Sequence, residues 1–251
     1  MFDGTLLGLG PLALGFALLA MFLGAVIRGY SGFGSSMFWV TSISLVVPPA
    51  GIVPTIYMLE VLASAHLLRR AWGEVDWRSV RWMLLGALLA TPAGVYLLAT
   101  LPAAPMRVAI SLVVLGAVAV LWRGTGSERR LGTGVTLATG AVSGLINGAT
   151  SAGGPPAVLY YLASPVSAAA MRASLIAYLL GTDVLATGFA AAEGLITRDV
   201  LLRSAAFFIV VLAGLVLGQR RFIETRPESF RRFVLILLGV LALAGLARAM
   251  L

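Results

Sequence analysis

The sequence predicts an all-α, polytopic membrane protein made of two inverted repeats of about five helical segments each, with short or broken helices meeting at mid-membrane. Three observations predict this class. Of the 251 residues, 60% are hydrophobic and 11% are charged, whereas soluble domains carry roughly 25% charged residues. Apolar runs recur along the whole chain. Two glycine-rich interruptions also stand at matching places in the two halves.

Charged residues, prolines and glycines divide the chain into apolar runs that we expect to be helices. The first set covers residues 6–28, 35–47, 51–68, 82–99 and 106–122, and the second covers 132–147, 155–163, 168–192, 201–218 and 232–249. The chain therefore divides into a first membrane repeat (1–124), a cytoplasmic linker (125–131) and a second membrane repeat (132–251), within one integral membrane domain.

The second run of each set is short. At 1.5 Å per residue, 155–163 reaches about 14 Å and 35–47 about 20 Å, and a hydrocarbon core is about 30 Å thick. Whether these runs span or re-enter stays open. Exposed backbone amides are costly in lipid, so the interruptions should be covered by protein or surround a cavity.

Arginine sets the expected orientation. All 18 basic residues are arginines and the net charge is +8. The loops 69–81, 123–130 and 219–232 are richest in arginine, and the positive-inside rule places them in the cytoplasm. The N-terminus is then outside, in a bacterial plasma membrane. It carries Asp3 and lacks a basic start, which favours a first membrane segment over a cleaved signal peptide.

The two interruptions repeat a string. Gly-Ala-Val at 24–26 recurs at 140–142, and a shift of 116 positions (140 minus 24) also aligns a glycine, a serine and a terminal proline. Paired glycine and proline breaks in two halves of a membrane protein are typical of a transporter substrate site. A broken helix exposes N–H groups and the positive end of its dipole, which together bind anions.

Small and polar residues of both breaks are therefore candidate anion-binding residues. In the first break they are Arg28, Tyr30, Ser31, Gly32, Gly34, Ser35 and Ser36, and in the second Asn147, Gly148, Thr150, Ser151, Gly153 and Gly154. Pro155 and Pro156 remove two donors from the second break, so it depends on Gly153 and Gly154 N–H groups and on side chains. The alternative is that these small residues only let helices pack closely.

Charged residues inside the apolar runs are functional candidates. Arg28 either faces an anionic substrate or pairs with Glu60 of the neighbouring run. Glu60 and Asp183 are candidates for proton coupling or for a structural ion pair. Arg107 and Arg172 open their runs, and we expect them to mark the membrane interface.

Several functions are excluded. With no cysteine and one histidine, disulfides, thiol catalysis and metal centres built on cysteine or histidine are not expected. We predict no enzyme activity, metal or cofactor, and ATP-driven transport would need a separate subunit. The positive charge lies in loops, so nucleic acid is not an expected partner. The expected partners are a small anion and the lipid bilayer, and a homodimer is left open.

The run Gly-Gly-Pro-Pro-Ala-Val-Leu-Tyr at 153–160, together with both breaks, resembles the TauE/SafE sulfite-exporter family of permeases. The first break reads Ser-Gly-Phe-Gly-Ser-Ser at 31–36, in place of the family's usual Gly-Gly-Gly form. The resemblance implies transport of sulfite or organosulfonates such as sulfoacetate and toluenesulfonate, in either direction, with the break loops lining the anion site.

The sequence thus predicts a secondary transporter for a small sulfur-containing anion, working by alternating access at the two breaks, with proton coupling through Glu60 or Asp183. The alternatives are a passive anion channel and a cation transporter that uses Glu60 and Asp183.

Overall fold

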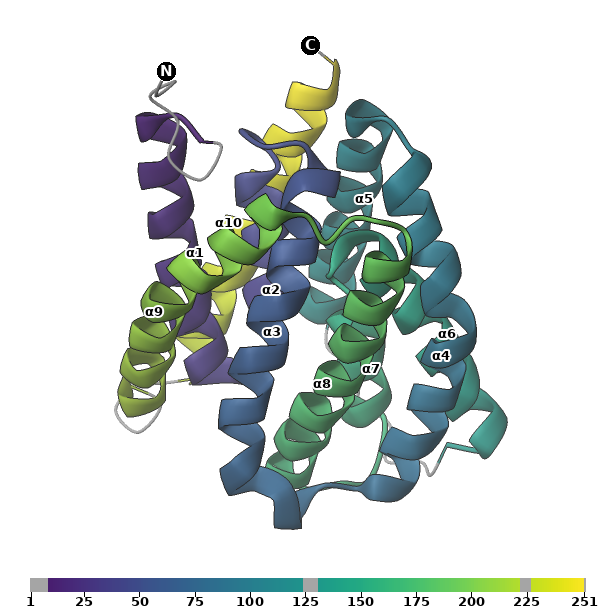
Figure 1. Cartoon of the computed structure of the whole chain (residues 1–251). Coiled ribbons are helices and arrows are strands. Elements are labelled where there is room, and N and C mark those ends of the chain that lie inside the picture. The colour runs from purple at the N-terminus through teal and green to yellow at the C-terminus, as the bar shows by residue number, and fades with distance from the viewer. Residues whose placement is uncertain (1–8, 124–130, 222–226, 251) are drawn as a thin grey trace.

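A computed structural model describes residues 9–123, 131–221 and 227–250 of the chain (Figure 1). The described residues form α-helices and one 3-10 turn. In chain order these are α1 (Pro11–Ser31), α2 (Ser35–Ile43), α3 (Pro49–Ala71), η1 (Trp72–Glu74), α4 (Trp77–Thr100), α5 (Ala103–Arg123), α6 (Thr133–Thr150), α7 (Gly154–Leu162), α8 (Ala168–Ala192), α9 (Arg198–Arg221) and α10 (Pro227–Met250).

Each predicted apolar run corresponds to one helix, so the all-α prediction is confirmed. The short helices α2 and α7 have nine residues each, about 14 Å by the helical rise. α2 ends four residues earlier than predicted, at Ile43, because residues 44–47 form a turn that leads into Pro48 and Pro49.

Six of the described helices are long and apolar enough to cross a bilayer. These segments are Pro11–Gly29, Pro49–Arg69, Trp77–Thr100, Ala103–Val120, Ala168–Ala192 and Arg198–Gln219. The chain is therefore a multi-pass membrane protein.

Left-handed residues produce both breaks. α1 ends where Gly32 takes φ 82°, and α2 begins after Gly34 at φ 93°. α6 ends at Ser151, which takes φ 58° although it has a side chain. Glycine adopts this conformation at little cost, whereas other residues are strained in it.

Around the breaks, the helix starts of the second half follow those of the first at an offset of 119. α7 begins 119 residues after α2 (154 minus 35), and α8 begins 119 residues after α3 (168 minus 49). This differs by three from the offset of the matching strings.

The helices pack in pairs that join the two halves. α1 lies along α9, α4 along α6 and α5 along α10, while α3 and α8 pack at the centre (Figure 1). Glycines permit the closest approaches: a Cβ on Gly140 would lie 2.0 Å from the Met83 carbonyl oxygen, and one on Gly29 would lie 2.4 Å from that of Leu215. Small residues therefore bring α6 against α4 and α1 against α9.

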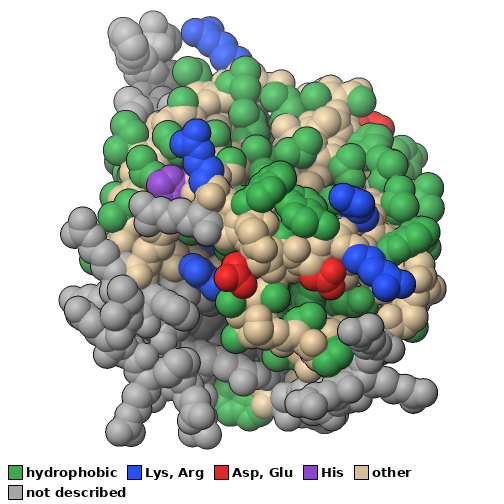
Figure 2. All heavy atoms as spheres, turned by 90° about the horizontal axis from the view of Figure 1, so that it is seen from below, with side chains coloured by type: hydrophobic (Ala, Val, Ile, Leu, Met, Phe, Trp, Pro, Cys, Tyr) green, Lys and Arg blue, Asp and Glu red, His purple; other side chains and the backbone are tan. Residues whose placement is uncertain are grey.

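One end of the bundle carries arginines. The turn from α3 to α4 and the starts of α6 and α8 lie at this end, whereas α1 begins at the opposite end (Figure 1). Arg69, Arg78 and Arg81 are exposed there, and Figure 2 shows arginine and acidic side chains on this face. Residues 124–130 and 222–226, which belong to two of the arginine-rich loops, lie outside the described residues.

Candidate functional site

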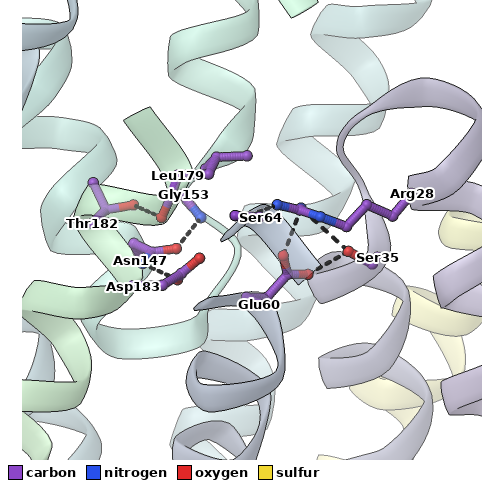
Figure 3. Close-up of polar contacts among 9 residues, drawn as sticks. All are labelled: Arg28, Ser35, Glu60, Ser64, Asn147, Gly153, Leu179, Thr182 and Asp183. Atoms are coloured by element: carbon purple, nitrogen blue, oxygen red, sulfur yellow. Dashed lines mark hydrogen bonds and ion pairs between the residues drawn. The ribbon is translucent and has the colours of Figure 1, made fainter. Parts of the chain in front are cut away.

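The first polar cluster forms where α1 ends and α2 begins, around Arg28. Arg28 is 0% exposed, and its Nη1 lies 2.5 Å from Oε2 of Glu60 on α3. Its Nη2 donates a hydrogen bond of 2.5 Å to the hydroxyl of Ser64, one turn further along α3. The Ser35 hydroxyl donates to the other carboxylate oxygen of Glu60 (Figure 3). One ion pair therefore joins α1, α2 and α3.

The ion pair leaves hydrogen-bond donors available at the break. The Nε of Arg28 is buried and has no hydrogen-bond partner among the described residues. No side chain caps the first turn of α2, where the N–H groups of Ser35, Ser36 and Met37 lack intrahelical acceptors. Because Ser35 bonds Glu60, this helix start lies at the ion pair. The first break thus combines a guanidinium, a carboxylate and uncapped backbone donors.

The second polar cluster forms where α6 ends and α7 begins, around Asn147. Its Nδ2 donates to Oδ1 of Asp183 on α8 at 2.8 Å, and its Oδ1 accepts from the Gly153 N–H at 3.3 Å (Figure 3). Asn147 is 1% exposed and Asp183 2%. Among the described residues no basic side chain forms an ion pair with Asp183. A neutral amide therefore holds this carboxyl.

The two clusters occupy equivalent places. At the offset of 119, Arg28 corresponds to Asn147 (147 minus 28) and Ser64 to Asp183 (183 minus 64). The contact from α1 to α3 thus recurs between α6 and α8 with different chemistry. Both clusters lie in the interior of the bundle, where Arg28, Glu60 and Asp183 are buried. They lie at the same level of the bundle in Figure 3.

The predicted residues of the first break have different places in the structure. Arg28 and Ser35 meet in the cluster, and Ser36 is buried beside it. Gly32 and Gly34 provide the left-handed turns. The backbones of Tyr30 and Ser31 belong to α1, but their side chains lie outside the described residues.

The second break offers fewer donors than predicted. The Gly153 N–H already donates to Asn147. The Thr150 hydroxyl donates to the Ile146 carbonyl and accepts from the Ala152 N–H. The Ser151 hydroxyl is buried without a partner among the described residues.

Two glycines of the second break differ in their surroundings. A Cβ on Gly148 would lie 2.4 Å from the Thr91 carbonyl oxygen, so this glycine packs α6 against α4. Gly154 is buried, yet a Cβ on it would meet nothing within 4 Å. Free space therefore adjoins the start of α7.

Arg172 contacts the first break, which the sequence did not predict. Instead of only marking the interface, Arg172, the fifth residue of α8, donates from Nη2 to the Gly29 carbonyl at 3.3 Å. Its side chain also lies against Gly32. Tyr57 of α3 makes a comparable bond across the halves, from its hydroxyl to the Gly148 carbonyl at 2.5 Å. Neither contact leaves a signal in the sequence, because each joins residues about ninety or more positions apart.

Comparisons with known proteins identify the family of the chain. The chain matches the family described as sulfite exporter TauE/SafE over residues 16–245. It is similar to the probable sulfite/organosulfonate exporter TauE of Cupriavidus necator, with 25% identity over 224 residues that cover 86% of this chain and 88% of the relative. No solved structure matches the chain. The family match includes both breaks and both clusters, so this chain belongs to the TauE/SafE family of membrane transporters, which are not enzymes.

Proposed function

We propose that the protein is a secondary transporter that moves a small sulfur oxyanion or organosulfonate by alternating access at its two helix breaks. The observation that carries this proposal is the wholly buried Arg28 beside the uncapped start of α2. A buried arginine in a membrane protein usually faces a partner or a substrate pathway. The family and the printed name of the relative support a sulfur-containing anion as the substrate.

The two halves act as inverted repeats in this proposal. Three features support it: the offset of 119 between helix bounds, the start of α1 and α6 at opposite ends, and the pairing of α1 with α9 and of α6 with α4. In inverted repeats the substrate site lies where the broken helices meet. The arginine-bearing end is then cytoplasmic by the positive-inside rule.

Anion binding uses the donors that the ion pair leaves. The Nε of Arg28 and the N–H groups of Ser35 and Ser36 contact the oxyanion, and Glu60 holds the guanidinium in place. A helix start and a guanidinium both favour negative charge. Asp183, which faces only the Asn147 amide in its cluster, is the carboxyl that exchanges a coupling proton.

Uptake into proteoliposomes tests the proposal. Purified protein should accumulate sulfite or a short sulfonate with saturable kinetics, and a pH gradient should change the rate. Flux that is linear in substrate and insensitive to the gradient would indicate a passive channel. A cation transporter would lose activity in Glu60→Gln while Arg28→Ala retained it, whereas the proposed anion site requires Arg28.

A further inference from the structure

A cavity of about 540 Å³ opens at the arginine-bearing end of the bundle, between the starts of α4 and α6 and the end of α7. It lies in the size range of small-molecule sites. Most of its lining is polar: Asp76, Arg78, Ser79, Thr133, Thr136, Tyr160 and Ser164. Asp76 also caps α4 by accepting from the Ser79 N–H at 3.4 Å, so the lining carries one carboxylate, Asp76, and one guanidinium, Arg78.

Two tyrosines at the end of α7 bond residues of the cavity lining, and Tyr160 itself lines the cavity. The Tyr161 hydroxyl lies 2.8 Å from the Ser79 hydroxyl on α4, and the Tyr160 hydroxyl accepts from Thr136 on α6 at 3.0 Å. The two rings meet edge to face with centroids 5.2 Å apart. We call these two bonds the α7 latch, because they hold the end of α7 to both walls of the cavity.

Free space lies at the other end of the same short helix. Gly154 begins α7 and is buried, yet a Cβ there would meet no atom within 4 Å. Gly154 follows Gly153, which bonds Asn147 of the second cluster. α7 therefore stands between the cavity and the polar clusters, and it is only nine residues long.

The equivalent helix of the first half is held differently. At the offset of 119, Tyr160 and Tyr161 correspond to Thr41 and Ser42 of α2. Both of these hydroxyls donate to carbonyls of their own helix. α2 is instead fixed by Trp39, whose Nε1 donates to the Met21 carbonyl at 3.0 Å. Within the described residues, the hydroxyl latch is a feature of α7.

We propose that the cavity is the vestibule through which the anion reaches the breaks from the arginine-bearing end, and that the α7 latch closes it. This inference rests on the proposed transport function. When the tyrosine bonds break, α7 tilts and the cavity joins the space beside Gly154. Arg78 and the hydroxyls of the lining can donate hydrogen bonds to an anion with several oxygen acceptors, such as a sulfonate.

Thiol labelling tests the latch, since the chain contains no cysteine. Gly154→Cys serves as the reporter in sided membrane vesicles, probed with a methanethiosulfonate that carries a sulfonate and with one that carries a trimethylammonium group. Exposed Gly73→Cys and Thr100→Cys identify the two ends. We expect Tyr161→Phe to raise labelling of Gly154→Cys from the Gly73 end about fivefold, the equilibrium weight of one hydrogen bond.

Matched variants separate the latch from general loosening. Ser79→Ala should raise labelling as Tyr161→Phe does, whereas Ser42→Ala should leave it unchanged, because that hydroxyl bonds only its own helix. Arg78→Gln should lower the ratio of sulfonate to trimethylammonium labelling. Ser151→Cys, a nearly isosteric change at a buried hydroxyl, is the second reporter if Gly154→Cys does not fold.

Three outcomes overturn the proposal. The first is equal labelling in Tyr161→Phe, Ser79→Ala and the parent reporter. The second is a rise in labelling that occurs only from the Thr100 end, and the third is an Arg78→Gln ratio equal to the parent's. The assay contains no transported substrate. Failed labelling would therefore leave the substrate class intact, and failed sulfite uptake would leave the latch intact.

Discussion

The break between α1 and α2 and the break between α6 and α7 share a backbone plan but differ in chemistry. Each joins a long helix to one of nine residues, and each places a polar side chain of the long helix against the central pair α3 and α8. In the first break that side chain is an arginine paired with a carboxylate. In the second it is an amide bonded to a carboxyl.

This difference indicates what each break contributes to an anion transporter. The first retains unpaired donors on Arg28 and at the start of α2, which suits oxyanion binding. The second satisfies most of its donors internally, but it borders free space at Gly154 and a cavity behind Tyr160. In the proposed transporter, the first break therefore binds the anion and the second provides room for movement.

Removing the cation of the first break should have the largest effect. Arg28→Ala leaves the Glu60 carboxylate buried without its partner, so the free energy of unfolding should fall by about 3–5 kcal/mol. Sulfite uptake should fall at least about tenfold, because the anion loses a charge-assisted hydrogen bond. Thermal unfolding in detergent and proteoliposome uptake measure the two effects.

The double variant Arg28→Met with Glu60→Gln is the control for folding. It removes both charges, so it should recover much of the stability while transport stays lost. Uptake that recovers with stability would show that Arg28 has only a structural role.

The equivalent change in the second break should cost less. Asn147→Ala removes two buried hydrogen bonds, to Asp183 and to the Gly153 N–H, each with a net contribution of about 0.5–1.5 kcal/mol to the free energy of unfolding. Ser64→Ala, at the position equivalent to Asp183, should cost less again because Arg28 keeps Glu60. Thermal unfolding of both variants measures the order. If Ser64→Ala proved the more damaging, the two clusters would not differ as their hydrogen bonds indicate.

Much of this fold could be predicted from the sequence, because hydropathy marks long helices and proline with glycine marks their breaks. Which residues of the two halves are equivalent could not be predicted from the sequence. The repeated sequence Gly-Ala-Val aligns Gly24 with Gly140, but both glycines allow close packing. A Cβ on Gly24 would overlap the Trp39 ring, and a Cβ on Gly140 would overlap the α4 backbone. The helix bounds instead align Arg28 with Asn147, two residues with no chemical likeness. Sequence alone also left two alternatives for Arg28. The structure contains the ion pair with Glu60, and the contact with the anion is part of the proposed function.

Two glycines of the second break should respond differently to alanine, because Gly148 lies at a close helix contact and Gly154 borders free space. Gly148→Ala would bring its Cβ to 2.4 Å from the Thr91 carbonyl oxygen, so α4 and α6 must move apart at a cost of about 1–3 kcal/mol. Gly154→Ala meets no atom within 4 Å, and the added methyl should change stability by less than about 1 kcal/mol. Thermal unfolding compares the two. In the first half, Gly29→Ala should behave like Gly148→Ala, since its Cβ would lie 2.4 Å from the Leu215 carbonyl oxygen. Equal stability of all three variants would contradict this assignment.

The smallest effects concern the residues that end α1 and α6. Gly32 takes φ 82° with the Arg172 side chain 3.0 Å from a Cβ built on it, so Gly32→Ala should lower stability by about 1–2 kcal/mol. Thermal unfolding measures this loss.

Ser151 takes φ 58° with a buried hydroxyl that lacks a partner among the described residues. Ser151→Gly should therefore raise the melting temperature. Uptake measured on the same preparation then shows whether the strained backbone at Ser151 contributes to transport. If the more stable Ser151→Gly protein transports sulfite more slowly, the hydroxyl contributes to the anion site and the strained backbone serves function. If uptake is unchanged, Ser151 only ends the helix, and the second break contributes room for motion without a ligand of its own at this position.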